Sequence, residues 1–293
     1  MRLRAVLAIA AGLALGACAG PPEREQSRSM PLASFGQLEE LASRLPGRYG
    51  AARRLDQEQP GTQMQLSTVM RGDGTLVLEF RELLEKRQRG FILTLSSMAA
   101  TTFIPGRFHP LQTDGTPSAQ SCAMRFVVRD GLLSGETDPD QCRFGASEDA
   151  VGLLKEVALD ADQVIIADQL IAAGTGEDNP PDILRLYRLD SFLGQVRVRE
   201  QAGSGWRTAE EFLIAVGSRP IEPLDAADMP LDVVIRLELI QGQQPGSPLL
   251  SLQALQSDTD NMLGHVWADR QARRLGLALD HIQVDLEKPP PRP

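Results

Sequence analysis

The chain has 293 residues, of which 39 are acidic and 30 are lysine or arginine, so its formal net charge at pH 7 is −9. A surface with this excess of carboxylates repels the phosphate backbone, which excludes nucleic acid as the main partner. Aromatic residues make up 4% of the chain. We therefore expect a core built mainly from leucine, valine and isoleucine.

The first 20 residues, MRLRAVLAIAAGLALGACAG, have the organisation of a bacterial export signal. Two arginines precede an apolar run that is too short for a permanent transmembrane helix, which needs about 20 residues. Leu15-Gly16-Ala17-Cys18 has the form of a lipobox. Residues 1–17 are thus expected to be cleaved, and Cys18 to carry palmitate-type acyl chains that anchor the protein in a membrane. Ala19 after the cysteine favours the outer membrane, facing the periplasm; the alternative is an ordinary signal peptide with a coincidental cysteine.

Residues 18–33 are polar, contain proline and have no hydrophobic periodicity, which predicts a flexible tether between the lipid and the folded chain. A helix is expected next, over SFGQLEELASRLPG (34–47). Ser34 and Gln37 have capping-box spacing, apolar residues follow at helical intervals, and Gly47 is a stop signal. One amphipathic helix should therefore open the domain.

Beyond this helix, short apolar segments are separated by turn residues, the pattern of β-strands. The clearest hairpin joins TQMQLSTVM to TLVLEFREL through the turn RGDG (71–74), and this turn accounts for the adhesion-like Arg-Gly-Asp letters. Further strands are expected at RGFILTLSS, MRFVVR, GLLSG, KEVALD, QVIIAD and DILRLYRLD. Because the helical linkers of a parallel sheet are missing, the predicted fold is mainly β, an antiparallel meander that closes into a barrel.

With Cys18 assigned to the lipid, Cys122 and Cys142 remain in a chain exported to an oxidising compartment. No histidine or further cysteine lies near either residue in sequence, which disfavours a metal site, and there is no CxxC motif, which disfavours a redox site. We therefore expect a Cys122–Cys142 disulfide, which on the chain-entropy model would contribute about 3 kcal/mol to stability.

The segment between these cysteines also carries a family resemblance. The order of cysteine, strand, turn with Gly131 and Gly135, short strand and second cysteine is similar to the CpcT/CpeT family of phycobiliprotein chromophore lyases, and the resemblance covers residues 36–190. The other matching positions are Gly47, Tyr49, Gln57, Pro60, Glu79, Arg87, Gln88 and Arg89. This resemblance implies a calycin- or lipocalin-like antiparallel barrel, opened by the N-terminal helix, with a ligand cavity at one mouth.

In that family the cavity holds a bilin, a linear tetrapyrrole, and delivers it to a cysteine of an antenna protein. The resemblance implies arginines facing the propionates of the ligand, for which Arg87, Arg89 and Arg125 are candidates, and a carboxylate facing its pyrrole nitrogens, for which Glu79 is the candidate. The alternative is that all four lie on the solvent face of their strands. The chain departs from the family in having Lys86 in place of a tyrosine and in its export signal, since antenna proteins are cytoplasmic.

Residues 191–288 lie beyond the resemblance and are predicted to be a β-rich (α+β) extension, either a second small domain or an addition to the barrel of residues 34–190. TAEEFLIAVG is expected to be a short helix, because Thr208 and Glu211 have capping-box spacing. GQVRVRE is expected to be a strand, and LDVVIRLELI, LLSLQALQ, MLGHVWAD and LALDHIQVDL four strands, or three strands and a helical turn. Residues 289–293 form a proline-rich tail.

Signatures of catalysis are absent from the sequence: it contains no GxSxG, HExxH or phosphate-binding glycine loop, and His109, His265 and His281 are scattered. We predict no catalytic residue, no metal ligand and no cofactor, apart from a bilin or another tetrapyrrole as ligand. The favoured function is a non-enzymatic, lipid-anchored binding module that holds a small apolar or tetrapyrrole-like molecule. The alternatives are a bilin lyase and an envelope scaffold that binds a protein partner.

Overall fold

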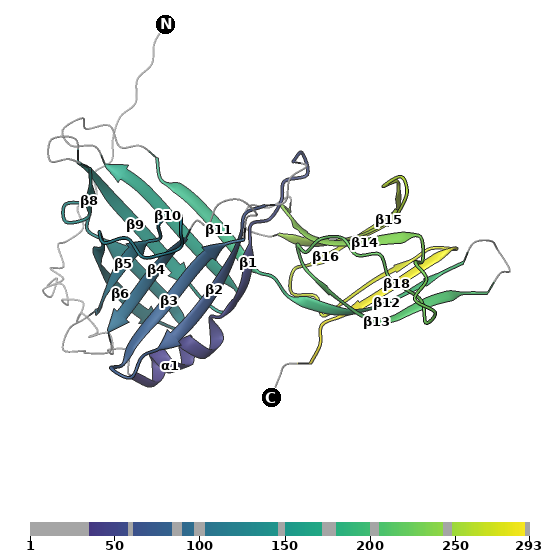
Figure 1. Ribbon diagram of the computed structural model, residues 1–293, viewed down its shortest axis with the longest axis horizontal. Coiled ribbons are helices and arrows are strands. Elements are labelled where there is room, and N and C mark those ends of the chain that lie inside the picture. Colours follow the sequence, from purple (N-terminus) through teal and green to yellow (C-terminus); the bar gives the residue numbers. More distant parts are fainter. Residues whose placement is uncertain are drawn as a thin grey trace, which may run out of the picture. The chain divides into compact units, whose positions relative to one another are not determined.

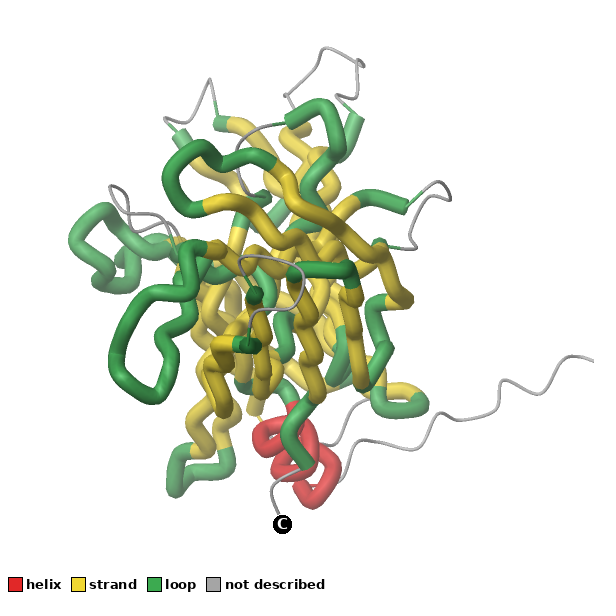
Figure 2. Tube along the Cα trace, turned by 90° about the vertical axis from the view of Figure 1, so that its right-hand side faces the viewer, coloured by secondary structure: helices red, strands yellow, loops and turns green. Residues whose placement is uncertain are grey.

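The computed structural model describes residues 35–57, 61–83, 90–96, 103–145, 150–171, 180–199, 205–242 and 248–290. Within these residues the protein is mainly β, with one short helix, α1 (Phe35–Arg44), and strands β1 to β18 (Figure 2). The strands form an 11-stranded, a four-stranded and a three-stranded sheet.

The 11-stranded sheet contains a closed antiparallel barrel, as the sequence predicts (Figure 1). Consecutive strands pair as a meander, and the ring is completed by the pairing of β9 with β10 and of β11 with β1. Its ten strands are β1 (Gly47–Gly50), β2 (Gln63–Met70), β3 (Thr75–Glu82), β4 (Gly90–Ser96), β5 (Ile104–Pro110), β6 (Cys122–Arg129), β7 (Leu132–Thr137), β9 (Val151–Leu159), β10 (Gln163–Ile171) and β11 (Asp182–Arg188). The short β8 (Arg143–Phe144) pairs with β9 beside the ring.

Alternation along each strand directs one set of side chains into the barrel. In β3, Leu76, Leu78 and Phe80 are buried, while Val77 and Glu79 between them are partly exposed. Because successive side chains of a strand point to opposite faces, the apolar set forms the core and the other set contacts solvent.

Two tight turns form as their residues predict. Asp73 Oδ1 accepts a hydrogen bond of 2.9 Å from the backbone N–H of Thr75, and Gly74 has a φ of 80°, so RGDG joins β2 to β3. Asp130 and Gly131 have φ values of 52° and 80° between β6 and β7. Paired positive φ values are the signature of a type I′ hairpin turn, which suits the twist of the strands it connects.

Helix α1 packs at one end of the barrel, where β2 ends and β3 begins (Figure 1). Its apolar face supplies Leu38 and Leu41 to the barrel core, and Leu45 follows just after the helix. Thr68 of β2 donates its hydroxyl to the carbonyl of Ala42 at 2.6 Å. We call this the helix end; the expected capping residue Ser34 lies outside the described residues.

The C-terminal strands form two sheets around a second hydrophobic core. The four-stranded sheet has the order β13-β12-β18-β17 and the three-stranded sheet the order β14-β15-β16. Their bounds are β12 (Ser191–Val198), β13 (Arg207–Ala215), β14 (Val233–Ile240), β15 (Leu249–Gln256), β16 (Met262–Asp269), β17 (Arg274–Ala278) and β18 (Ile282–Glu287). The predicted segment LALDHIQVDL is divided between β17 and β18, so the described residues after 230 contain five strands and no helical turn.

The helix expected over TAEEFLIAVG is wrong, because residues 208–215 of this segment belong to strand β13. Glu210 and Glu211 together oppose Gln195 of β12, and Glu211 has a φ of 56°. This is a β-bulge, in which one strand carries an extra residue. Pairing with β12 satisfies the backbone of β13, so the local capping pattern is overridden by the tertiary context.

Candidate functional site

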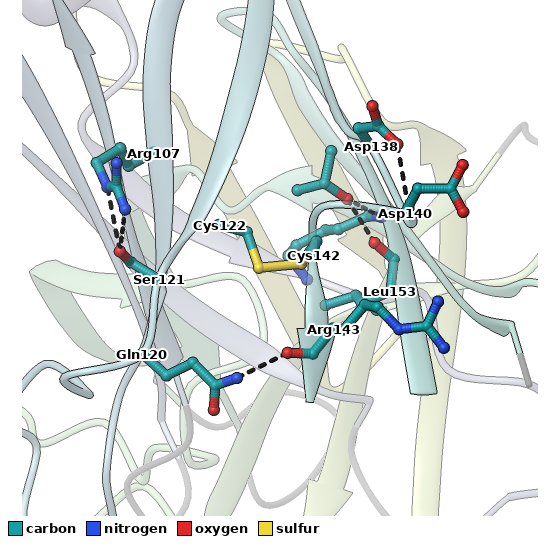
Figure 3. Close-up of a disulfide and its surroundings, with 11 residues drawn as sticks. Arg107, Gln120, Ser121, Cys122, Asp138, Asp140, Cys142, Arg143 and Leu153 are labelled. Carbon is teal, nitrogen blue, oxygen red and sulfur yellow. Dashed lines mark hydrogen bonds between the residues drawn. A yellow bond between two sulfur atoms is a disulfide. The ribbon is translucent and has the colours of Figure 1, made fainter. Parts of the chain in front are cut away.

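The end of the barrel opposite α1 is where β3 ends and β6 begins; we call it the disulfide end. The predicted disulfide is confirmed here, with an S–S distance of 2.02 Å between Cys122, the first residue of β6, and Cys142 (Figure 3). Both cysteines are buried in the barrel core. Gln120 supports the same connection by donating its side-chain amide to the carbonyl of Arg143 at 2.7 Å. The loop after β7 is thereby connected to the start of β6.

An ion pair lies inside the barrel near this end. Lys155 of β9 and Asp168 of β10 are direct cross-strand partners, and the lysine Nζ donates to both carboxylate oxygens, at 2.7 and 2.9 Å. The side chain of Lys155 is 4% exposed and that of Asp168 44% exposed. Water therefore reaches the pair from the carboxylate side, while the ammonium group is enclosed by protein.

Aromatic rings surround the enclosed ammonium group. Its Nζ lies 4.5 Å from the ring centroid of Phe91 and 4.8 Å from that of Phe108, distances at which a cation is attracted to the ring face. Phe91 also stacks on Phe80, with centroids 4.5 Å apart. Burial lowers the pKa of Lys155 from its ordinary value, and the carboxylate of Asp168 partly opposes this effect. We call Lys155, Asp168, Phe91 and Phe108 the lysine cluster.

A buried hydroxyl fixes the backbone that carries the lysine. Thr137 of β7 is 2% exposed, donates its hydroxyl to the carbonyl of Leu153 at 2.7 Å, and accepts the backbone N–H of Lys155 at 2.8 Å. The backbone N–H of Leu153 is bound in turn by the carbonyl of Cys142 at 2.8 Å. The disulfide and the lysine cluster are therefore linked by three consecutive hydrogen bonds.

Two of the residues predicted to contact a ligand, Glu79 and Arg125, face away from the interior of the barrel. Glu79 lies between the buried Leu78 and Phe80, so it faces outward, where it forms an ion pair with Arg81. Arg125 likewise alternates with buried neighbours in β6, and its side chain is 56% exposed, 3.7 Å from Asp138. The structure thus places both residues on the outer face of their strands.

The remaining predicted site residues, Arg87, Arg89 and Cys18, lie outside the described residues. Their roles in ligand binding and in lipid attachment stay predictions.

Tyr49, one of the positions shared with the resembled family, is buried in the barrel core. Its ring is 1% exposed, and its hydroxyl donates to the carbonyl of Leu45 at 2.7 Å. Burial raises the pKa of Tyr49 to about 12, although Arg188 opposes this rise. A phenol that stays protonated and bonded to the backbone holds β1 against the helix end of the barrel.

No group of three metal-ligating side chains occurs among the described residues, which include all three histidines. His109 of β5 is partly buried; this burial, together with Arg107 and Arg71, lowers the pKa of its imidazole. His265 lies beside Trp267 on β16, with ring centroids 5.4 Å apart. In the part of the chain that the structure covers, no helix is long and apolar enough to cross a membrane.

Sequence reasoning missed the lysine cluster, although a signal for it exists. In LLKEVAL, Lys155 has the same phase as Leu153, Val157 and Leu159, which all face the core. A single charged residue in the apolar phase of an alternating strand predicts a buried charge. Its partner could not be found this way, because it depends on the register between β9 and β10.

No protein-family model matches the chain. No curated protein matches it significantly.

Proposed function

We propose that the protein is a lipid-anchored envelope protein whose barrel, calycin-like in architecture, binds a small and largely apolar ligand at the disulfide end. The observation that carries the proposal is the lysine cluster. Transferring an ion pair from water into an apolar interior costs several kcal/mol per ion, and a fold alone gains little from it. Buried, perturbed titratable groups of this kind concentrate at functional sites.

The chemistry of the cluster suits a conjugated ligand with both acidic and N–H groups, such as a linear tetrapyrrole. Asp168, whose side chain is 44% exposed, offers an acceptor for pyrrole N–H groups. Behind it lie the enclosed ammonium group of Lys155 and the buried rings of Phe91 and Phe108, which a ligand would reach by displacing side chains and which would then supply a cation for a propionate and apolar faces. Lys155 and Asp168 would take the roles that the family resemblance assigned to the arginines and to Glu79.

The test is a titration of the full chain carrying Cys18→Ser, which keeps every described residue, with biliverdin and with a fluorescent naphthalene sulfonate probe. We expect saturable binding at one site. In Lys155→Met and Asp168→Asn, binding should weaken at least about tenfold, which corresponds to about 1.4 kcal/mol. Lys288→Met is the matched control, because Lys288, just after β18, pairs with Asp190, just before β12, at 2.7 Å, and its replacement should leave binding unchanged.

Absence of saturable binding by every probe would overturn the proposal in favour of the scaffold function, in which the barrel is filled by its own side chains. Covalent transfer of biliverdin from the protein to an acceptor thiol would instead favour the lyase. Labelling of wild-type cells with radioactive palmitate tests the anchor separately: label and membrane association should both be lost in Cys18→Ser.

A further inference from the structure

Trp267 is exposed on the outer face of the three-stranded sheet. Trp267 of β16 is 52% exposed, and the exposed ring of His265 lies two residues before it, with centroids 5.4 Å apart. Val266 and Ala268, which alternate with these residues, pack against the second core. The chain has only one other tryptophan, Trp206, whose ring is covered by the guanidinium group of Arg199 at 4.9 Å.

The strand register places hydrogen-bonding side chains beside these two rings. Trp267 is the partner of Ser251 on β15, and Ser251 is the partner of Glu238 on β14. In the neighbouring row, His265 pairs with Gln253 and Gln253 with Arg236. Directly opposed residues of antiparallel strands lie on the same face of a sheet, so all six side chains share one face, on which Ser251 is buried at 1% exposure. We call it the tryptophan face.

A polar pocket of about 680 Å³ adjoins the β14 side of this face. Glu238 and Arg236 belong to both, and the segment at Arg53 forms another wall, hydrogen-bonded through its backbone to Leu239 and Gln241. Arg53 Nη2 donates to Glu238 at 2.8 Å, which neutralises both charges. Arg236 has no ion-pair partner among the residues that the structure describes, so its guanidinium group can bind an anionic group of a ligand.

This combination selects one class of ligand. An apolar molecule would leave the guanidinium group of Arg236 without a partner, at a cost of about 1–3 kcal/mol. A sugar ring offers an apolar C–H face for an indole and a ring of hydroxyl groups for amide, guanidinium and carboxylate side chains. A carboxylate on the sugar would pair with Arg236.

We propose that the tryptophan face and its pocket bind a carboxylate-bearing oligosaccharide. One sugar stacks on Trp267 and His265, and a neighbouring sugar places its carboxylate on Arg236. The two ends of this site are two strand spacings apart, roughly 10 Å, so the occupant is a chain of sugars and not a single ring. The site lies on the C-terminal strands and is independent of the ligand proposed for the barrel.

The position of the two tryptophans allows a direct test on the full chain carrying Cys18→Ser. Trp206→Phe leaves Trp267 as the sole indole emitter and should not change binding. The probes are uronate oligosaccharides from hyaluronan, alginate and polygalacturonate, with chitotetraose as the uncharged comparison. We expect saturable quenching or a spectral shift with at least one uronate, and affinity for chitotetraose at least about tenfold lower.

Calorimetry then compares the variants. Trp267→Ala and Arg236→Gln should each weaken uronate binding at least about tenfold, while Trp206→Phe and Arg199→Gln should not. Circular dichroism at equal concentration verifies that each variant is folded, and Trp267→Phe should retain more affinity than Trp267→Ala because it keeps an aromatic face. The proposal is overturned if no uronate binds, if chitotetraose binds as tightly as the uronates, or if Trp267→Ala retains full affinity. Capture of a peptide in place of the sugars would also contradict it.

Discussion

Lys155 and Asp168 are direct cross-strand neighbours inside the barrel, and only the carboxylate reaches water. Removing the two partners should therefore have unequal effects. Asp168→Asn leaves a buried ammonium without its counter-charge and should lower the free energy of unfolding by about 2–3 kcal/mol, less than the 3–5 kcal/mol of a fully enclosed pair. Lys155→Met replaces the charge with an apolar chain of similar length and should change stability by less than about 1 kcal/mol. Urea denaturation of both variants measures the difference, and equal losses would contradict this account.

The same pair makes a prediction about pH. The pKa of Lys155 is lowered in the folded protein, so between that pKa and the ordinary lysine value the unfolded chain binds more protons than the folded one. Wild-type stability relative to Lys155→Met should therefore rise as pH increases through this window. Denaturation of both proteins at several pH values from neutrality to about pH 10 tests the sign. If the relative stability falls as pH increases, the carboxylate of Asp168 has a larger effect on the pKa of Lys155 than burial has.

Removal of the disulfide should destabilise the barrel. Cys122 and Cys142 are 20 residues apart in sequence, so replacing both with alanine releases loop-closure entropy worth about 3 kcal/mol on the chain-entropy model. The urea midpoint of the double variant, followed by far-UV circular dichroism, should fall accordingly. Cys18→Ser is the matched control and should leave the midpoint unchanged. Addition of a reductant should shift the wild type toward the double variant but leave that variant where it is.

Phe126 occupies the space that two glycines leave open on neighbouring strands. A Cβ at Gly135 would lie 2.3 Å from the Phe126 ring, and one at Gly106 would lie 2.5 Å from it. Gly135→Ala should therefore cost about 1–3 kcal/mol by overpacking. The matched control is Gly72→Ala, whose Cβ would meet nothing within 4 Å. In a Phe126→Leu background, Gly135→Ala should lower the free energy of unfolding by less than it does in the wild type. If the effects of the two substitutions are additive, the Phe126 ring is not the group that the new methyl group contacts.

The bulge in β13 predicts an unusual gain from glycine. Glu211 has a φ of 56°, a conformation that costs an ordinary residue roughly 1–2 kcal/mol and glycine almost nothing. Glu211→Gly should therefore raise the free energy of unfolding, by up to about 1 kcal/mol. Glu210→Gly, at the adjacent position of the same strand, should lower it. Thermal unfolding of both variants tests this prediction. A lower stability of Glu211→Gly than of the wild type would argue against the bulge.

Much of the barrel could be predicted from local sequence patterns, and the strand that the prediction missed was missed for an identifiable reason. The strands with regular alternation and the Asp-Gly turns were recognisable, whereas β5 was not, because proline disfavours a strand. In the fold, Pro105 is the second residue of β5 and Pro110 its last, and Gly106 between them leaves room for the Thr94 carbonyl and the Phe126 ring. The outward orientation of Glu79 and Arg125 could have been inferred, since each lies between two apolar residues that face the core.

By itself, the sequence determined the class of fold, the hairpin turns and the disulfide, since alternation, turn preference and the count of cysteines are properties of short segments. Only the tertiary structure decided that Lys155 meets Asp168, that TAEEFLIAVG is a bulged strand, and that Trp267 shares a face with Arg236. The physical reason is register. A strand is specified by its own residues, but the side chain beside each of them is set by how the strands close on one another, and pairing of that kind can override a local helix signal.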